Sequence, residues 1–387
     1  MTGRRGRGEG SVYQRKDARP DGTIRIRWAG EIDLGWIDGR RARKTVYGRT
    51  RKECYDSLQA AQRAIGSGLN PAPERLTMET YLTDWLATHR REIRASTFAS
   101  YEAIVRVHLI PGIGQNRLAR LTVPDVRRLL HAKSDAGLSP RRVAMIRAVL
   151  RTALSQAVKD RNVPVNVAEL ADPPKQERHE IKPLTKEEVR QFLDAIAGHR
   201  LEGLFVTALS SGLRSGELRA LRWADINLDL RTLSVEAGMT KVAGEWQRGP
   251  TKSKTSKRMV PLPDRAIVAL REHQVRQQAE REHAGTEWIG NKWDLVFVSE
   301  VGTPLDASNV VHTYQRELAR AGLPRQRFHD TRHSVATFWL AAGVPARVVA
   351  DMLGHSQVSL TLNVYTHVVP SLRREAADRL DAILTGS

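Results

Sequence analysis

Residues 201–223 read LEGLFVTALSSGLRSGELRALRW, and a glycine divides this stretch into two helices. The first helix is apolar and is expected to end at Gly212, because glycine readily adopts the left-handed conformation that closes many helices. A second helix is expected to begin at once, with Arg214 at its start. A guanidinium held after a glycine break is a candidate functional group. Arg214 is therefore the first residue of the predicted site.

The sequence around this stretch predicts helices mixed with a small sheet. Thr185 and Glu188 form the T-x-x-E pattern of a capping box, which predicts a helix start. The segments TLSVEAG and KRMVPL have the character of strands, and a lysine-rich turn with Lys252 and Lys254 is expected to link them. Helices are expected from there to the C-terminus. The predicted fold class is α+β: a mainly helical domain with a small antiparallel sheet.

Two proline-containing polar stretches, GSGLNPAPERLT and ELADPPKQERHEIKPLT, divide the chain into three parts. We expect domains over residues 1–70, 75–175 and 180–387. All three parts carry a positive net charge.

The first part is predicted to hold three strands followed by a helix. TIRIRW alternates, with Ile24, Ile26 and Trp28 on one face and arginines on the other. Thr50 and Glu53 form a capping box that predicts the start of the helix. A sheet with an arginine-rich face suits the DNA major groove, and a solvated sheet face is the alternative.

The middle part is predicted to hold four helices. Ser96 or Thr97 is expected to cap the second helix, which is expected to end before the IPGIG segment. Thr122 precedes the third helix, and Ser139 precedes the fourth. The inner face of the fourth helix is predicted to comprise Val143, Ile146, Leu150, Leu154 and Val158.

The charge of the chain indicates a polyanionic partner. The sequence has 62 Lys and Arg against 43 Asp and Glu, a formal net charge of +19. This excess favours a nucleic acid or an anionic surface, with a merely soluble basic protein as the alternative. No apolar run approaches the ~20 residues of a membrane span, and the start has no secretory pattern. Cys54 is the only cysteine, which excludes an intramolecular disulfide and a cysteine-based zinc site and favours a cytosolic setting.

Two further motifs carry polar groups suited to chemistry. HDTRH places His329 and Arg332 three residues apart, on neighbouring parts of one helical face. LGHSQVSLTLNVYTH adds His355 and Tyr365. These groups suit transesterification of a phosphodiester, because a tyrosine oxygen can displace a DNA oxygen once its proton, of reference pKa about 10, is removed.

The other residue types fit the same reaction. Two arginines offer planar forks to the charge that grows on the non-bridging oxygens. A hairpin lysine can protonate the leaving 5′-oxygen, and histidines can bind the phosphate and assist proton transfer near neutral pH. No carboxylate cluster has the spacing of a divalent-metal site. The predicted chemistry therefore uses no metal or other cofactor.

At this point the sequence resembles the tyrosine recombinases, or phage integrases. SGLRSGEL and LRWADI resemble the first arginine box of the family, and HDTRH, LGHS and YTH resemble the second box and the tyrosine motif. Among the hairpin lysines, Lys252 matches best and Lys254 is the alternative. Thr331 departs from the leucine that is common in the family. The resemblance implies a catalytic set of Arg214, Lys252, His329, Arg332, His355 and Tyr365.

The resemblance covers the whole third part and implies a site-specific DNA recombinase. Such an enzyme cuts and rejoins DNA through a 3′-phosphotyrosyl link and integrates or excises a prophage or other mobile element. The middle part resembles the family's core-binding domain, and the first part resembles its arm-binding domain. The implied partners are double-stranded DNA, a homotetramer on synapsed sites, and an accessory DNA-bending or excision factor, without a membrane. The implied location is the bacterial cytoplasm, at the nucleoid.

Three other classes of protein share some of these features. HDTRH resembles a zinc-protease helix, with His329 and His333 as ligands and Asp330 in place of the glutamate base. A DNA-binding regulator without catalysis would have the same charge. A type IB topoisomerase would share the chemistry. Glu217 could orient Arg214, cap a helix or lie on a solvated face, and Arg219 is expected to contact phosphate.

Overall fold

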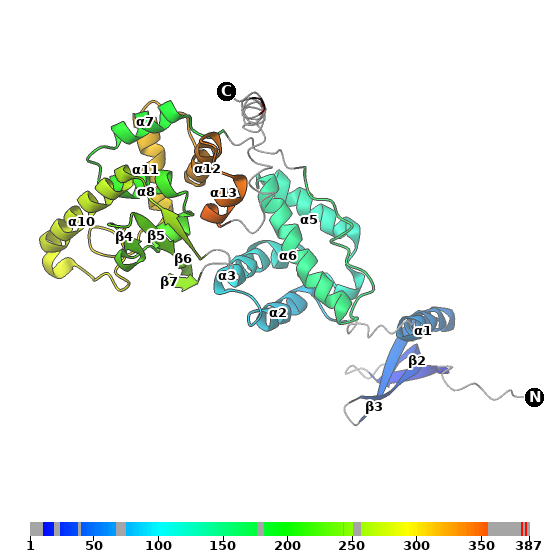
Figure 1. Cartoon of the computed structure of the whole chain (residues 1–387). Coiled ribbons are helices and arrows are strands. Elements are labelled where there is room, and N and C mark those ends of the chain that lie inside the picture. The colour runs from blue at the N-terminus through cyan, green and yellow to red at the C-terminus, as the bar shows by residue number, and fades with distance from the viewer. Residues whose placement is uncertain are drawn as a thin grey trace, which may run out of the picture. The chain divides into compact units, whose positions relative to one another are not determined.

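The computed structural model describes residues 11–18, 24–37, 40–66, 75–175, 182–242, 244–250 and 257–354, together with residues 381 and 384. By its internal contacts the chain divides into two compact units, Met1–Glu177 and Arg178–Ser387. Figure 1 shows the helices and strands of each unit, and each unit is described separately below.

The first unit begins with an antiparallel sheet covered by one helix. The strands β1 (Ser11–Ala18), β2 (Ile24–Ile37) and β3 (Arg40–Gly48) pair in that order, and α1 (Arg51–Gly66) follows. The Thr50 hydroxyl accepts from the Glu53 amide at 3.1 Å, as expected of a helix cap. The Glu53 carboxylate accepts from the Arg49 amide instead of completing the box on Thr50. The small core comprises Ile32, Val46, Cys54 and Leu58.

The predicted alternation along β2 is only partly matched by burial. Trp28 is half-buried and packs against the core of the sheet. Ile24 and Ile26 share its side of the strand but are 65% and 56% exposed. The expected apolar face therefore reaches further along β2 than the part that is covered.

The rest of the first unit is helical. Tyr81, Leu82 and Trp85 are buried on the inner face of the first of these helices. The predicted starts at Thr122 and Ser139 are confirmed, since each side chain caps its helix. The elements are α2 (Met78–His89), α3 (Ala95–Ile104), a π turn (Val105–Leu109), α4 (Ile110–Ile113), a 3₁₀ turn (Leu118–Arg120), α5 (Val123–Asp135) and α6 (Pro140–Lys159).

Two predictions about α3 are wrong. Its N-cap is Arg94, so Ser96 and Thr97 lie inside the first turn. The helical backbone also continues through the IPGIG segment to Ile113. Pro111 has no amide proton to donate, but it stands in the first turn of α4, after a π turn, where that loss is tolerated.

The second unit has a helical core beside two small sheets, which confirms the predicted fold class. Its central helix α8 is buried almost all round and contacts α10 and α12. Phe192, Phe205, Tyr314 and Phe328 make edge-on and tilted ring contacts in the core. The helices are α7 (Lys186–Ala195), α8 (Glu202–Ser211), α9 (Ser215–Arg219), α10 (Asp264–Ala284), α11 (Ala307–Arg320), α12 (Thr331–Ala341) and α13 (Ala346–Leu353).

The two predicted strands of this unit pair, but a further hairpin lies between them. β5 pairs antiparallel with β8, with Leu233 opposite Val260. The chain between them forms a separate hairpin of β6 and β7, so the predicted direct link by a turn is wrong. The strands are β4 (Ile226–Asn227), β5 (Thr232–Val235), β6 (Ala237–Val242), β7 (Glu245–Pro250) and β8 (Arg258–Pro261).

Candidate phosphate-binding site

The junction between α8 and α9 positions Arg214. Gly212 ends α8 with φ +61°, the left-handed conformation predicted for it. Leu213 is buried, and Arg214 is the N-cap of α9 with extended backbone. A Cβ at Gly212 would lie 2.8 Å from Cδ2 of Leu353, so the end of α13 packs directly on this turn. The turn therefore places Arg214 beside the end of α13.

Glu217 orients Arg214 from one turn further along α9. Nη1 of Arg214 donates to the Glu217 carboxylate at 2.8 Å, and the Arg214 amide donates to it at 3.0 Å. Glu217 is 6% exposed. Burial alone would raise the pKa of the Glu217 carboxyl, but hydrogen bonds and charge from Arg258 and Arg214 outweigh burial and lower it. Glu217 is thus an ionised, buried anchor, and the alternative of a solvated face is wrong.

Arg332 lies on α12 and is 2% exposed. Its Nη1 donates to the carbonyl of Gly212 at 2.7 Å, and its Nη2 donates to the carbonyl of Leu353. Arg214 donates from Nη2 to the next carbonyl, that of Gly354, at 3.1 Å. The two predicted arginines therefore converge on adjacent carbonyls at the end of α13.

His329 precedes α12 in a 3₁₀ turn, Phe328–Asp330. Burial lowers the pKa of His329, and the nearby charges of Arg332 and Arg214 lower it further, although Asp330 raises it. The imidazole is therefore neutral at pH 7. Because the charges of Arg332 and Arg214 both act on the pKa of His329, His329 lies near both arginines.

Three of the six predicted catalytic residues, Arg214, His329 and Arg332, are thus brought together. The other three, Lys252, His355 and Tyr365, lie outside the described residues, as does Lys254. Gly354, the last described residue of this segment, directly precedes His355.

Arg258 is a contact of this site that the sequence did not single out. It begins β8, and its Nη2 donates to Glu217 at 2.8 Å. A usable signal was the alternation of KRMVPL, which puts Arg258 on the same face as the buried Val260. Arg219 was expected to contact phosphate, but it is 6% exposed and donates to the carbonyls of Leu305 and Met239. Its role is structural.

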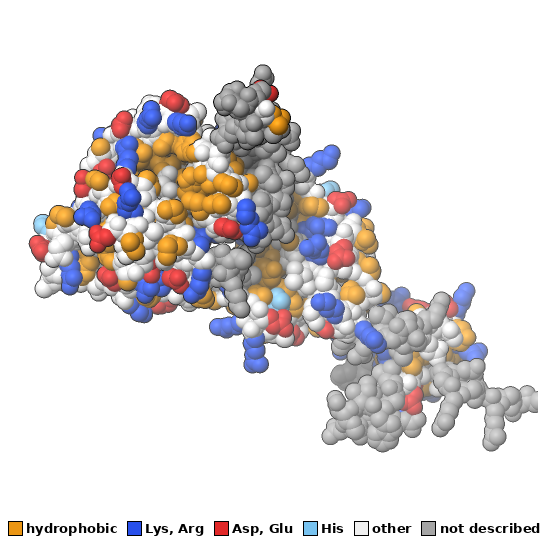
Figure 2. Space-filling view, in the orientation of Figure 1, with side chains coloured by type: hydrophobic (Ala, Val, Ile, Leu, Met, Phe, Trp, Pro, Cys, Tyr) orange, Lys and Arg blue, Asp and Glu red, His pale blue; other side chains and the backbone are white. Residues whose placement is uncertain are grey.

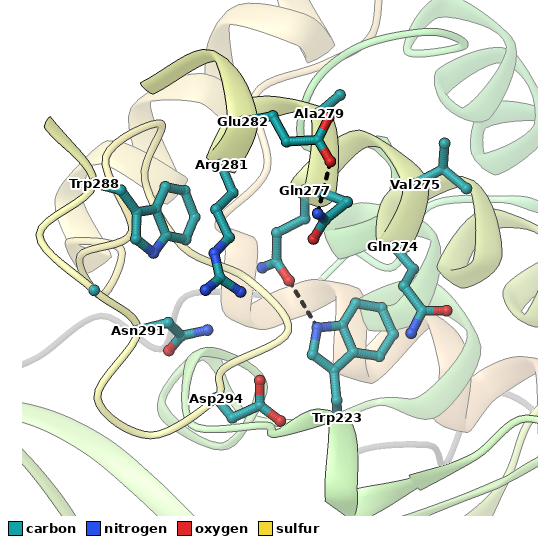
Figure 3. A pocket seen from close by; sticks show the side chains of 12 residues that line it. Trp223, Gln274, Val275, Gln277, Ala279, Arg281, Glu282, Trp288, Asn291 and Asp294 are labelled. Atoms are coloured by element: carbon teal, nitrogen blue, oxygen red, sulfur yellow. Dashed lines mark hydrogen bonds between the residues drawn. The ribbon is translucent and has the colours of Figure 1, made fainter. Parts of the chain in front are cut away.

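A cavity of about 820 Å³ in the same unit is a separate feature. Figure 3 shows its side chains, with the Trp223 indole donating to Gln277 at 2.8 Å. None of the described residues of the candidate site lines it. Its lining includes Trp223, Gln277, Arg281, Trp288, Asn291 and Asp294.

Positively charged side chains are widely distributed on the face of the molecule that Figure 2 shows. On the face shown in Figure 2, Lys and Arg side chains are spread over both units rather than gathered in one patch. This agrees with the positive charge of all three parts of the sequence. Among the described helices, none is long and apolar enough to cross a membrane.

A buried carboxylate orients one of two converging guanidinium groups, and guanidinium groups held in this way suit an oxyanion such as a phosphodiester. Comparison with known proteins agrees. Residues 182–371 match the model of the phage integrase family, and residues 77–134 match the phage integrase N-terminal SAM-like domain.

Similar proteins carry related names. A tyrosine recombinase XerC-like protein of Caldanaerobacter subterraneus subsp. tengcongensis is 31% identical over 362 residues, covering 89% of this chain and 93% of the relative. An integrase of Streptomyces ambofaciens is 31% identical over 392 residues, covering 99% and 98%. Among solved structures, the Tn1549 transposon integrase bound to a circular intermediate DNA has a TM-score of 0.68 at 21% identity, covering 79% of this chain and 99% of that one.

The chain belongs to the phage integrase family of tyrosine recombinases. It is a site-specific recombinase, as predicted, and it is an enzyme. This family assignment replaces three alternatives: a zinc protease, a non-catalytic regulator and a type IB topoisomerase.

Proposed function

We propose that the chain exchanges DNA strands between two specific sites through a covalent tyrosyl intermediate. The observation that carries this proposal is the convergence of Arg214 and Arg332 at the end of α13, one residue before His355. Guanidinium groups fixed before the substrate arrives stabilise transition-state charge without reorganisation. In this proposal, Arg214 and Arg332 bind the phosphate.

The reaction then follows from the remaining motif residues. The phenolic oxygen of Tyr365 attacks phosphorus, and its proton passes to a histidine of the set. The bond from phosphorus to the 5′-oxygen breaks, and Lys252 or Lys254 donates a proton to that oxygen. Arg214 and Arg332 bind the non-bridging oxygens. The ester stores the energy of the broken linkage, so religation to a new 5′-hydroxyl needs no external energy source.

The upstream regions serve DNA binding in this proposal, with residues 1–70 as the arm-type domain, 75–175 as the core-site domain and 180–387 as the catalytic domain. In the helical region, burial lowers the pKa of His108, and the nearby charges of Arg142 and Lys133 lower it further. These two charges indicate a locally positive surface. On β2, the Arg27 guanidinium stacks on the Tyr47 ring at 3.8 Å. Positive charge of this kind suits phosphate contacts, and a sheet face suits a groove.

Assembly on DNA is also part of the proposal. A λ integrase tetramer has been solved on a Holliday junction, and its chain has a TM-score of 0.54 with this one at 18% identity, covering 90% of this chain and 94% of that one. By analogy, four copies of this chain synapse two duplexes and exchange strands in pairs. The sequence of residues 370–387 has apolar residues at helical spacing, which predicts a helix, and the family resemblance predicts that this helix contacts a neighbouring copy; apart from residues 381 and 384, this segment lies outside the described residues. An accessory DNA-bending or excision factor sets direction, and the element served is a prophage or another mobile element.

Recombination between two short duplexes that carry the attachment sites tests this function. We expect recombinant products in excess chelator, since the chemistry uses arginine and tyrosine. Relaxation of any supercoiled plasmid without site preference would favour a topoisomerase. Loss of activity in chelator that zinc restores would favour a metal mechanism.

A further inference from the structure

The last carbonyls of α13 are held by side chains from other elements. Helix ends leave carbonyls without partners inside the helix, and cationic donors stabilise them. Here three arginines from three elements take three consecutive carbonyls. Nε of Arg258 donates to Met352 at 2.6 Å, Nη2 of Arg332 donates to Leu353, and Nη2 of Arg214 donates to Gly354 at 3.1 Å.

Arg258 also donates hydrogen bonds to the carboxylate that orients Arg214. Its Nη2 and Nη1 lie 2.8 and 3.3 Å from the two oxygens of Glu217, a bidentate arrangement. Both side chains are only 6% exposed. Because Glu217 bonds Arg214 at 2.8 Å, one carboxylate connects Arg258 to the phosphate-binding arginine.

The backbone at Gly354 is fitted to Arg258. Gly354 has φ +65°, which disfavours other residues. A Cβ there would lie 3.0 Å from Nη1 and 3.3 Å from Cδ of Arg258. The guanidinium therefore packs against the chain directly before His355.

We propose that Arg258 is a positioning residue for the recombination reaction. With Glu217, it holds Arg214 and the end of α13 in the arrangement that receives the scissile phosphate. The inference rests on the function proposed above. It assigns a task to a residue of β8, the strand that follows the segment carrying Lys252 and Lys254.

Single-turnover cleavage of a half-site duplex, read as protein–DNA adduct after denaturation, tests the proposal. In Arg258→Lys the charge remains, but the bidentate contact and the Nε donor are lost. We expect the cleavage rate to fall about tenfold to a hundredfold, the effect of a small misplacement of catalytic groups, with the Kd for the duplex unchanged. The control is Arg271→Met on α10, whose guanidinium is exposed and 3.4 Å from Asp229; it should leave both values unchanged.

A substrate with sulfur in place of the bridging 5′-oxygen separates two routes of action. A thiolate leaves without needing a proton, so this substrate compensates for a misplaced lysine but not for a misplaced arginine. We expect Arg258→Lys to be as defective on the sulfur substrate as on the ordinary one. A normal rate on sulfur would mean that Arg258 acts on the lysine, and it would overturn the proposal.

A second variant guards against misfolding. Glu217→Gln keeps the shape of the side chain and removes the charge that Arg258 grips, and we expect the same pattern of a slow rate with unchanged Kd. Cleavage at the normal rate by folded Arg258→Lys, or by Glu217→Gln where the first variant fails to fold, would refute the positioning role alone. Absence of an adduct in the unmodified protein would instead refute the proposed function.

Discussion

At the turn between α8 and α9, one backbone angle decides where Arg214 lies. Gly212→Ala combines left-handed strain with a contact of 2.8 Å to Leu353, and it should destabilise the second unit by about 2 to 4 kcal/mol. Gly198→Ala is the matched control, because Gly198 has φ +75° but no atom within 4 Å of the added Cβ. It should cost only about 1 to 2 kcal/mol. Urea unfolding measures both, and equal losses would show that the packing on α13 is unimportant.

The lowered pKa of His329 predicts the pH dependence of cleavage. Burial and the neighbouring arginines favour the neutral imidazole, so activity that needs neutral His329 is retained as the pH falls to 6.5 and is lost only below it. Asp330 opposes this shift, and Asp330→Asn should move the acid limb to lower pH still. The single-turnover rate of adduct formation, measured between pH 5 and 8, gives the profile. An acid limb above 6.5 would contradict this environment for His329.

At the residue scale, the sequence motifs predicted the residues of the site better than the sequence pattern predicted which residues are buried or which strands are linked. Arg214, His329 and Arg332 were identified because their residue types and order suit phosphate chemistry, and the structure brings these three together. Arg258 was not identified, because a charged residue on a short strand usually faces solvent. Its partner Glu217 lies 41 residues earlier, and no local pattern links the two.

Among the elements, α8 and α10 pack around a buried histidine. The ring of His273 lies 2.8 Å from the carbonyl of Val296, and a Cβ on Gly203 of α8 would lie 2.9 Å from its Cβ. Burial lowers the pKa of His273 to about 4. Between pH 6.5 and 4, His273 is therefore protonated in the unfolded chain but neutral in the folded chain. The free energy of unfolding consequently falls as the pH falls through this window.

Replacing that histidine tests the linkage. His273→Gln removes the titration, and the melting temperature of the second unit should then depend less on pH between 7 and 4.5 than in the unmodified chain. The full pKa shift of His273, from 6.5 to about 4, corresponds to about 3 kcal/mol in the free energy of unfolding. His283 at the end of α10 has an exposed side chain, so His283→Gln is the control and should keep the original dependence. An identical pH dependence in His273→Gln would contradict the assignment.

Element starts were easier to predict than element interiors. Hydroxyl caps at Thr122, Ser139 and Thr185 are local signals, and each of them begins a helix. The π turn before Pro111 was missed because proline inside a helical pattern normally indicates an end. The β6–β7 hairpin was missed because its sequence has no Asn-Gly or Asp-Gly turn signal.

Across the whole molecule, the net charge of +19 predicts strong salt dependence of DNA binding. The logarithm of the binding constant should fall linearly with that of the salt concentration, with a slope near −0.9 per phosphate contact. Arg142→Gln should weaken binding to all duplexes by one common factor and reduce the slope by about 1. Arg271→Gln, on α10, should change neither. A sequence-dependent loss in Arg142→Gln would indicate contact with bases rather than phosphate.

The most direct test of the central claim is covalent capture by one phenolic oxygen. A half-site duplex is incubated with the protein, denatured, and examined for a protein–DNA adduct. The unmodified chain should give the adduct, and Tyr365→Phe, which lacks only a hydroxyl, should give none while binding the duplex with the same Kd. An adduct that persists in Tyr365→Phe would place the nucleophile elsewhere and contradict the account.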